Sequence, residues 1–141
     1  MTRFTRQIIA GTLLSAALLM SSTAFAGELE DRAEKVLAEA IKVAESGDMD
    51  KWIKEFCDPE RCHTQLSKEQ WKAYQLKQLK LQGGKCVTDG KVAVARWRGS
   101  LSDEGGKAKA YVTCENRQLP PPVEFRYDKE KDKIYIRNTS I

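Results

Sequence analysis

Residues 91–114 read KVAVARWRGSLSDEGGKAKAYVTC, and this stretch sets the architecture of the chain. Apolar and polar residues alternate along KVAVARWRG and along KAKAYVTC, which is the two-residue period of a strand with one face on a core. The segment SLSDEGG between them has the polar, glycine-containing composition of a turn. We therefore predict a β-hairpin with strands over residues 91–99 and 107–114.

Further strands are predicted on both sides of this hairpin. Residues 85–88 run into Asp89-Gly90, a strong signal for a two-residue hairpin turn. Residues 123–128 and 133–138 form a last hairpin around the charged turn KEKD. Together these segments predict an antiparallel sheet in the C-terminal half of the chain.

Helical periodicity precedes the strands. The first predicted helix, residues 28–46, carries a single apolar stripe made up of Leu29, Ala33, Val36, Leu37, Ala40, Ile41 and Ala44. Gly47 is its expected stop. Asp48 is the expected cap of a second helix over residues 48–57, which Pro59 brings to an end.

A third helix is predicted over residues 67–81, where Ser67 and Gln70 have the spacing of a capping box. Its apolar residues are scattered around the helical wheel. Either this helix is buried on several sides, or it gives way to extended chain near Leu79. Helices followed by strands predict an α+β fold, with N-terminal helices packed on a curved antiparallel sheet.

Residues 1–26 have the pattern of a secretory signal peptide. Arg3 and Arg6 make a basic start, residues 8–20 are largely apolar, and Ala24-Phe25-Ala26 fits a cleavage site. The apolar run is too short for a membrane span. Its alanine-rich style is typical of bacteria, so we expect a periplasmic or secreted protein and a single domain over residues 27–141.

The charge balance of that domain excludes one class of function. Arg3 and Arg6 account for two of the four net positive charges of the whole chain, so residues 27–141 carry a net charge of only +2. A dedicated nucleic-acid-binding domain would carry a strongly basic face. We therefore expect no nucleic-acid partner.

All four cysteines lie in the predicted domain, and an even number in a small exported protein indicates two disulfides. Of the three possible connectivities we favour Cys57–Cys62, a short loop around Pro59, which leaves Cys86–Cys114. The second bond has a difficulty. A strict two-residue turn at Asp89-Gly90 would place Cys86 on the sheet face away from Cys114.

The stretch AIKVAESGDMDKWIKEF, residues 40–56, resembles the opening of the nuclear-transport-factor-like (SnoaL-like) superfamily. In that family a long helix, a Gly-Asp break and a short helix precede a curved sheet. The resemblance implies a cone in which the long helix crosses the concave sheet face and leaves a pocket at one end. It also implies an outer sheet face that often forms dimers. The family includes enzymes and binding modules alike, so the resemblance implies a fold rather than a function.

Arg96 and Arg98 are the candidate ligand-binding residues. If Val94 pairs with Val112, the alternation places both arginines on the core face of the hairpin, beyond its last apolar residue. Two guanidiniums at the mouth of the cone would bind an anionic group bidentately. The alternative is that they only reach outward to solvent at the end of the sheet. A one-residue slip would send them to the other face.

The outer sheet face is the candidate interface. Its predicted members combine aromatic rings with arginine, a composition that protein contacts favour, namely Trp97, Tyr111, Arg126, Tyr135 and Arg137. The partner would be another protein, or a second copy of the chain in a homodimer. The alternative is an ordinary solvated sheet face.

His63 is the only histidine, and Cys57-x4-Cys62-His63 is a stretched relative of the haem-attachment motif. Neither a zinc site nor a nucleophile–base pair is indicated by the spacing of the remaining residues. We therefore expect no catalytic residues, no metal and no cofactor. The sequence favours an exported, non-catalytic binding module for a protein or a small anionic ligand. A small-pocket enzyme of the SnoaL-like type and a c-type haem protein are the alternatives.

Overall fold

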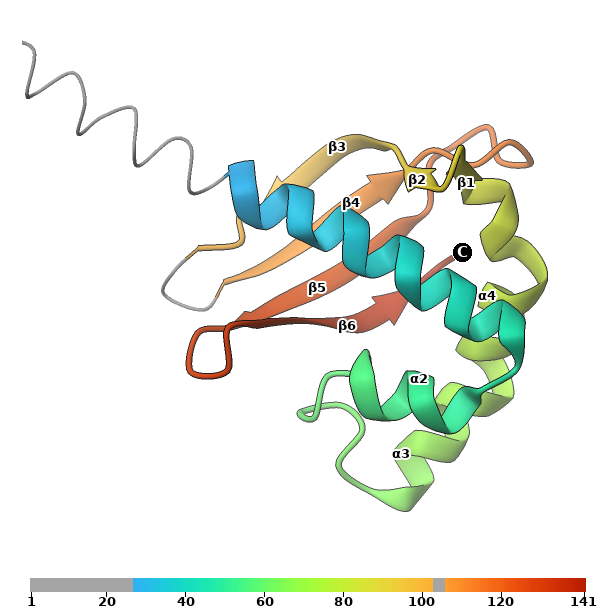
Figure 1. The fold of residues 1–141 in the computed structure, drawn as a ribbon, viewed down its shortest axis with the longest axis vertical. Coiled ribbons are helices and arrows are strands. Elements are labelled where there is room, and N and C mark those ends of the chain that lie inside the picture. Colours follow the sequence, from blue (N-terminus) through green and yellow to red (C-terminus); the bar gives the residue numbers. More distant parts are fainter. Residues whose placement is uncertain (1–26, 103–105) are drawn as a thin grey trace, which may run out of the picture.

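The computed structural model describes residues 27–102 and 106–141, and the predicted signal peptide lies outside them. Residues 27–46 form one long helix that lies across a face of an antiparallel sheet (Figure 1). The sheet has four strands in the order β3-β4-β5-β6. The predicted α+β class, with N-terminal helices packed on an antiparallel sheet, is confirmed.

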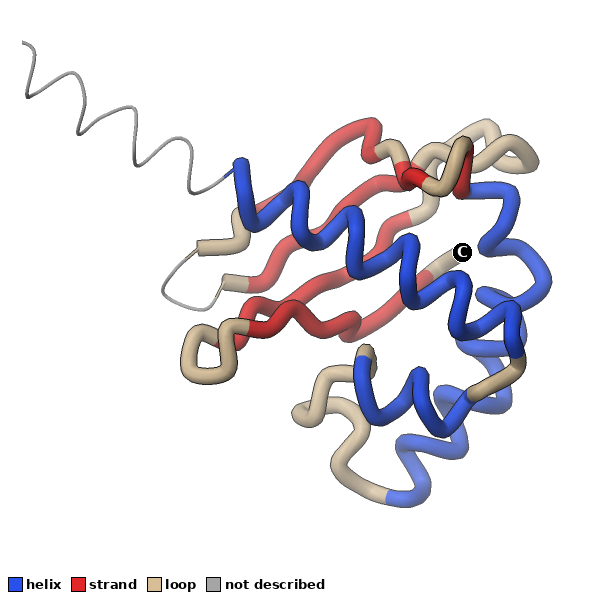
Figure 2. Tube along the Cα trace, in the orientation of Figure 1, coloured by secondary structure: helices blue, strands red, loops and turns tan. Residues whose placement is uncertain are grey.

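The elements after the first helix follow the predicted order. The helical ones are α2 (Met49–Glu55), α3 (Gln65–Gln70), a π-helical segment (Trp71–Leu76), α4 (Lys77–Gln82) and a 3₁₀ turn (Gly83–Cys86). The strands are β1 (Val87–Thr88), β2 (Lys91–Val92), β3 (Val94–Gly99), β4 (Lys107–Val112), β5 (Pro122–Asp128) and β6 (Lys133–Thr139). Figure 2 shows the helices gathered on one side and around one end of the sheet.

Two helix caps decide where the shorter helices begin. The side chain of Asp48 accepts a hydrogen bond from the Lys51 amide, as its predicted role requires. The third helix begins earlier than predicted, because Thr64 forms the capping box with Ser67. It also stays helical as far as Gln82, so the extended alternative near Leu79 is wrong.

The core lies between the long helix and the sheet. Leu37 and Ile41 from the helix are buried there with Phe125 and Ile136 from the sheet. Trp52 of α2 closes one end of this core, where its indole nitrogen donates a 2.9 Å hydrogen bond to a carbonyl of the long helix. A buried ring with a satisfied polar atom is the stable arrangement for tryptophan.

A bulge in β3 changes which face its side chains occupy. Val94 pairs with Val112, as predicted, but Arg96 pairs with Tyr111, so Ala95 is an extra residue in the ladder. Every residue after it is shifted to the opposite face. The predicted core-face position of Arg96 and Arg98 is therefore wrong, and both lie on the outer face.

The structure contains the two expected disulfides, Cys57–Cys62 and Cys86–Cys114. The turn at Asp89-Gly90 has the predicted two residues, with Thr88 opposite Lys91. Cys86 still reaches Cys114, because it lies in the 3₁₀ turn before β1 and does not follow the alternation of the strand. In the part of the chain that the structure describes, no helix is long and apolar enough to cross a membrane.

Candidate functional site

The outer face of the sheet, opposite the long helix, gathers most of the charged side chains of the strands. It divides into two parts. The part over β3 and β4 is here named the basic strip, and consists of Arg96, Arg98, Lys109 and Tyr111. The part over β5 and β6 is here named the ion-pair cluster, and consists of Asp58, Glu60, Glu124, Arg126 and Arg137.

The basic strip places like charges side by side. Arg98 lies directly opposite Lys109 in the β3–β4 ladder, and Arg96 lies opposite Tyr111. The three cationic residues are exposed, and Tyr111 is half-buried. The Arg96 guanidinium carbon lies 4.0 Å from the centre of the Tyr111 ring, which is a cation–π contact. This contact places the Arg96 guanidinium over the Tyr111 ring.

No carboxylate in the described residues lies within 4.0 Å of the charged atoms of Arg96, Arg98 or Lys109. Lys109 has a second cross-strand neighbour, Glu124 of β5. That carboxylate accepts a 3.0 Å hydrogen bond from Arg137 instead. The basic strip therefore carries charge that no side chain of residues 27–102 and 106–141 neutralises.

The ion-pair cluster is the opposite case, because its charges are satisfied within the protein. Arg126 donates two hydrogen bonds of 2.8 Å to the two carboxylate oxygens of Asp58. Arg137 donates to Asp58 at 2.8 Å and to Glu60 at 2.6 Å. Two-pronged guanidinium–carboxylate pairs of this kind are the strong ones. Asp58 has no exposed surface.

The environment of Asp58 favours its ionised form. Burial alone raises its pKa, but hydrogen bonds from Arg126, from the Glu60 amide and from Arg137 outweigh burial, and the pKa of Asp58 lies below its ordinary value. A buried carboxylate without such partners would take up a proton instead. The cluster therefore holds its loop in place as long as Asp58 is charged.

The loop that carries Asp58 is brought to the sheet by its backbone. Cys57 forms a parallel bridge with Ile136 of β6. The Asp58 amide donates to the Ile136 carbonyl at 3.0 Å, and the Ile136 amide donates to the Phe56 carbonyl at 2.7 Å. The Cys57–Cys62 disulfide closes this loop against the edge of β6. The most economical interpretation of the cluster is a brace that joins the loop to the sheet.

The five predicted interface residues do not form one surface. Trp97 lies on the core face, where its ring centre is 5.9 Å from that of Phe125, so its predicted outer position is wrong. Tyr135 is on the outer face but only 4 % exposed. Arg126 and Arg137 are engaged in the ion-pair cluster. Of the five, only Tyr111 belongs to the basic strip.

His63 is exposed, and its Nδ1 atom lies 3.2 Å from the Glu60 carbonyl oxygen. Cys57 and Cys62 are bonded to each other, so this arrangement offers no free thiol to a haem vinyl group. Among residues 27–102 and 106–141, no group of three or more histidine, cysteine or acidic side chains is placed to hold a metal ion.

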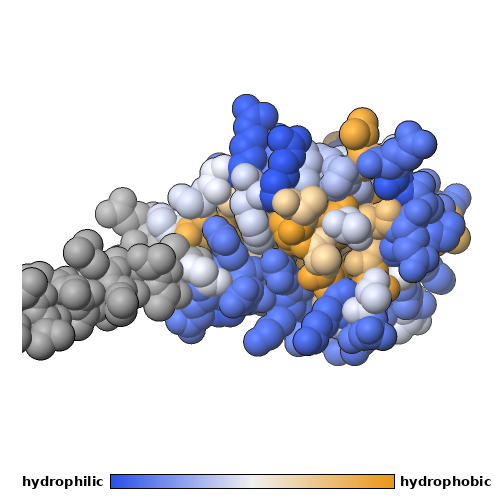
Figure 3. All heavy atoms as spheres, turned by 90° about the horizontal axis from the view of Figure 1, so that it is seen from above, coloured by the Kyte–Doolittle hydropathy of each residue, from blue (hydrophilic) through white to orange (hydrophobic). Residues whose placement is uncertain are grey.

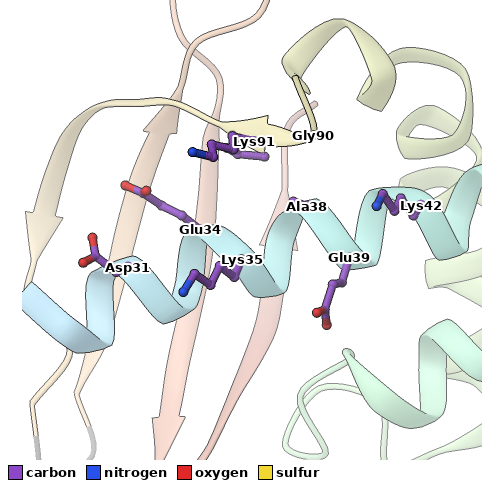
Figure 4. A pocket seen from close by; sticks show the side chains of 9 residues that line it. Asp31, Glu34, Lys35, Ala38, Glu39, Lys42, Gly90 and Lys91 are labelled. Atoms are coloured by element: carbon purple, nitrogen blue, oxygen red, sulfur yellow. The ribbon is translucent and has the colours of Figure 1, made fainter. Parts of the chain in front are cut away.

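A groove lies beside the long helix, on the other side of the molecule from the ion-pair cluster. It has a volume of about 520 Å³, and Asp31, Glu34, Lys35, Ala38, Glu39, Lys42 and residues 90–92 line it. Figure 4 shows Glu34 and Lys91 reaching into the space between the helix and the turn, with Glu39 pointing away from it. Burial and the neighbouring Asp31 and Glu30 raise the pKa of Glu34. Acidic and basic side chains are mixed along this groove.

No family model, no curated protein and no solved structure matches the chain. The resemblance of residues 40–56 to the nuclear-transport-factor-like superfamily therefore stays a prediction from the sequence.

Proposed function

We propose that the protein is an exported, non-catalytic binding module that recognises an acidic partner through the basic strip. Export is supported by the signal-peptide pattern of residues 1–26 and by the two disulfides, which persist in oxidising compartments such as the periplasm or the extracellular space. A nuclear-transport-factor-like origin is compatible with the long helix across the sheet, and remains part of the proposal.

The observation that carries the proposal is the pairing of Arg98 with Lys109. Like charges directly opposite each other in a sheet are destabilising. An isolated solvated face would gain stability from an acidic residue at either position. Together with Arg96, which Tyr111 orients, the pair supplies several N–H donors that an anionic group could accept.

Binding is favoured over catalysis because of the chemistry of the strip. Its residues offer positive charge and one aromatic ring on an open face. None of them has the arrangement of a nucleophile beside a base. Arginine and tyrosine are also the residue types that contribute most to binding energy at protein interfaces.

The test is equilibrium binding to a defined polyanion. Fluorescein-labelled poly-glutamate is titrated with wild-type protein and with the Arg96→Ala, Arg98→Ala double variant, and its anisotropy is followed. We expect the double variant to bind about tenfold more weakly, a loss of about 1.4 kcal/mol. We also expect wild-type binding to weaken as salt is raised, because exposed charges are screened.

The matched control is the Lys129→Ala, Lys131→Ala variant, which removes the same charge from two exposed positions in the turn between β5 and β6. Its affinity should stay within about twofold of wild type if binding is local to the strip. Equal losses in the two double variants would show that poly-glutamate responds only to net charge. That result would contradict the proposed function.

A further inference from the structure

We infer that the partner is an extended acidic segment of another protein, which binds by adding a strand to the free edge of β3. This inference rests on the proposed function and deepens it, because it states how the basic strip is used. Strand addition is a common mode of peptide recognition, in which backbone hydrogen bonds supply affinity and alternate side chains supply specificity.

The two edges of the sheet differ. β6 is covered along part of its length by residues 56–58, which pair with Ile136 through two backbone hydrogen bonds. β3 is the other edge strand, and in the described part of the chain it pairs with β4 alone. Among the described residues, no backbone group pairs with the outer edge of β3. An edge of this kind presents unpaired N–H and C=O groups to solvent.

The side chains of β3 define which strand would fit there. Arg96 and Arg98 are exposed on the outer face, and they flank Trp97, which is half-buried on the core face. An added strand would alternate in the same way. Along Arg96–Gly99, beyond the bulge, its outer residues would lie beside the two arginines and its inner residue beside Trp97. The fitting sequence therefore alternates acidic with apolar or small residues.

Figure 3 views the molecule from above, which is the side of β3 in Figure 1. A hydrophobic area occupies the middle of this view, and strongly hydrophilic side chains project around it. The half-buried apolar residues of β3 itself are Val94 and Trp97. This side of the molecule therefore combines apolar contact area with charge, as an alternating acidic strand requires.

A second copy of the chain fits the edge poorly. Pairing of β3 with β3 would bring Arg96 and Arg98 of one copy against the same cations of the other. Basic residues on edge strands are a known means of preventing such self-pairing. The positive charge of Arg96 and Arg98 disfavours a second copy of β3 and favours an acidic strand. We therefore assign the edge to an acidic segment of another protein.

The experiment uses an eight-residue peptide with the sequence Glu-Val-Glu-Thr-Glu-Val-Glu-Thr and two derivatives of it. One derivative carries N-methyl groups on the glutamate amides, and the other on the valine and threonine amides. In an added strand, alternate amides point toward the edge of β3. We expect one derivative to lose at least tenfold in affinity for the full exported protein, and the other to bind like the unmodified peptide.

Hydrogen exchange gives a second readout. Saturating peptide should slow the exchange of amides in Val94–Gly99, while amides in the turn between β5 and β6 exchange as before. Equal binding by both derivatives, with no new protection in β3, would overturn strand addition even if poly-glutamate still bound through Arg96 and Arg98. If neither the peptide nor poly-glutamate binds, the proposed function itself fails. Self-association of the protein with no peptide binding would assign the edge to a second copy instead.

Discussion

Arg98 and Lys109 lie directly opposite each other across the β3–β4 ladder, two cations where a stable sheet would place opposite charges. A directly opposed pair of opposite charges would contribute roughly 0.2–1 kcal/mol of stability, whereas a pair of like charges is destabilising. This unfavourable pair lies on an exposed face, next to Arg96, whose guanidinium lies over the Tyr111 ring. A substitution that removes the repulsion between Arg98 and Lys109 should therefore raise the stability of the fold and weaken the binding of an acidic partner.

We expect Arg98→Glu to raise the free energy of unfolding by about 0.5 kcal/mol, because it replaces a repulsive cross-strand pair by an attractive one. The same change should abolish binding to poly-glutamate. Urea denaturation and fluorescence anisotropy measure the two effects. Arg96→Glu is the control. Because Arg96 lies opposite Tyr111 and contacts its ring, this substitution relieves no cross-strand repulsion and should not raise the free energy of unfolding. A destabilised Arg98→Glu protein would contradict the view that this pair is kept for binding.

The second prediction concerns the buried carboxylate. Asp58→Asn should lower the free energy of unfolding by about 3–5 kcal/mol, because it leaves Arg126 and Arg137 without their buried counter-charge. Urea denaturation is again the measurement. Glu60→Gln is the control, since the Glu60 side chain is 53 % exposed and should contribute less than about 1 kcal/mol. Equal effects of the two substitutions would remove the brace interpretation of the cluster.

The third prediction is the pH dependence of that difference. The pKa of Asp58 is lowered by folding, so its contribution is fully present above the unfolded pKa of about 3.9 and is lost as the pH falls toward the folded pKa. The stability gap between wild type and Asp58→Asn should narrow by about 1 kcal/mol between pH 5 and pH 3. Exposed Asp50 and Asp132 also have lowered pKa values, but they titrate in both proteins and cancel in the gap. A gap that is constant down to pH 3 would show that the charge of Asp58 is not what stabilises the fold.

The fourth prediction separates Trp97 from the outer surface. Because its ring packs against Phe125 on the core face, Trp97→Ala should destabilise the protein by about 2 kcal/mol. A fully buried tryptophan would cost more, and this ring is only partly buried. Trp97→Phe, which keeps most of the contact area, should cost less than half as much. Thermal denaturation of the two variants measures both values. An unchanged melting temperature in Trp97→Ala would contradict the placement of the ring on the core face.

Much of the fold follows from local patterns in the sequence. The spacing of the apolar residues in 28–46 is enough to predict a helix, and the residue types of Asp89-Gly90 are enough to predict a turn. The disulfides could be paired because one loop is short and the other pair then follows. The beginning of the third helix was predicted two residues too late, because Ser67 is the partner of the Thr64 cap and not the cap itself.

The faces of β3 could not be obtained from simple alternation. One extra residue at Ala95 shifts every later side chain, and the letters V-A-R-W-R continue to look regular across it. One signal was present in the sequence, since Val94 and Trp97 are three residues apart, and two core-facing residues of a strand need an even spacing unless a bulge lies between them.

The ion-pair cluster lay beyond sequence reasoning for a different reason. Asp58 and Arg126 are 68 residues apart, and nothing local indicates that the loop from Cys57 to Cys62 reaches the edge of β6. That placement depends on the backbone bridge to Ile136, which exists only in the folded chain. The sequence did predict that Arg126 and Arg137 lie on the outer face, but not that a carboxylate already engages them there.

The basic strip is tested most directly by mapping a bound polyanion on the folded protein. The protein, labelled with nitrogen-15, is titrated with a ten-residue oligo-glutamate while its amide chemical shifts are followed. We expect the largest shifts in β3 and β4, around Arg96, Arg98 and Lys109, at peptide concentrations that leave the turn between β5 and β6 unchanged. Shifts centred on the lysines beside the long helix, or spread evenly over all exposed lysines and arginines, would contradict a binding site on the outer face of the sheet.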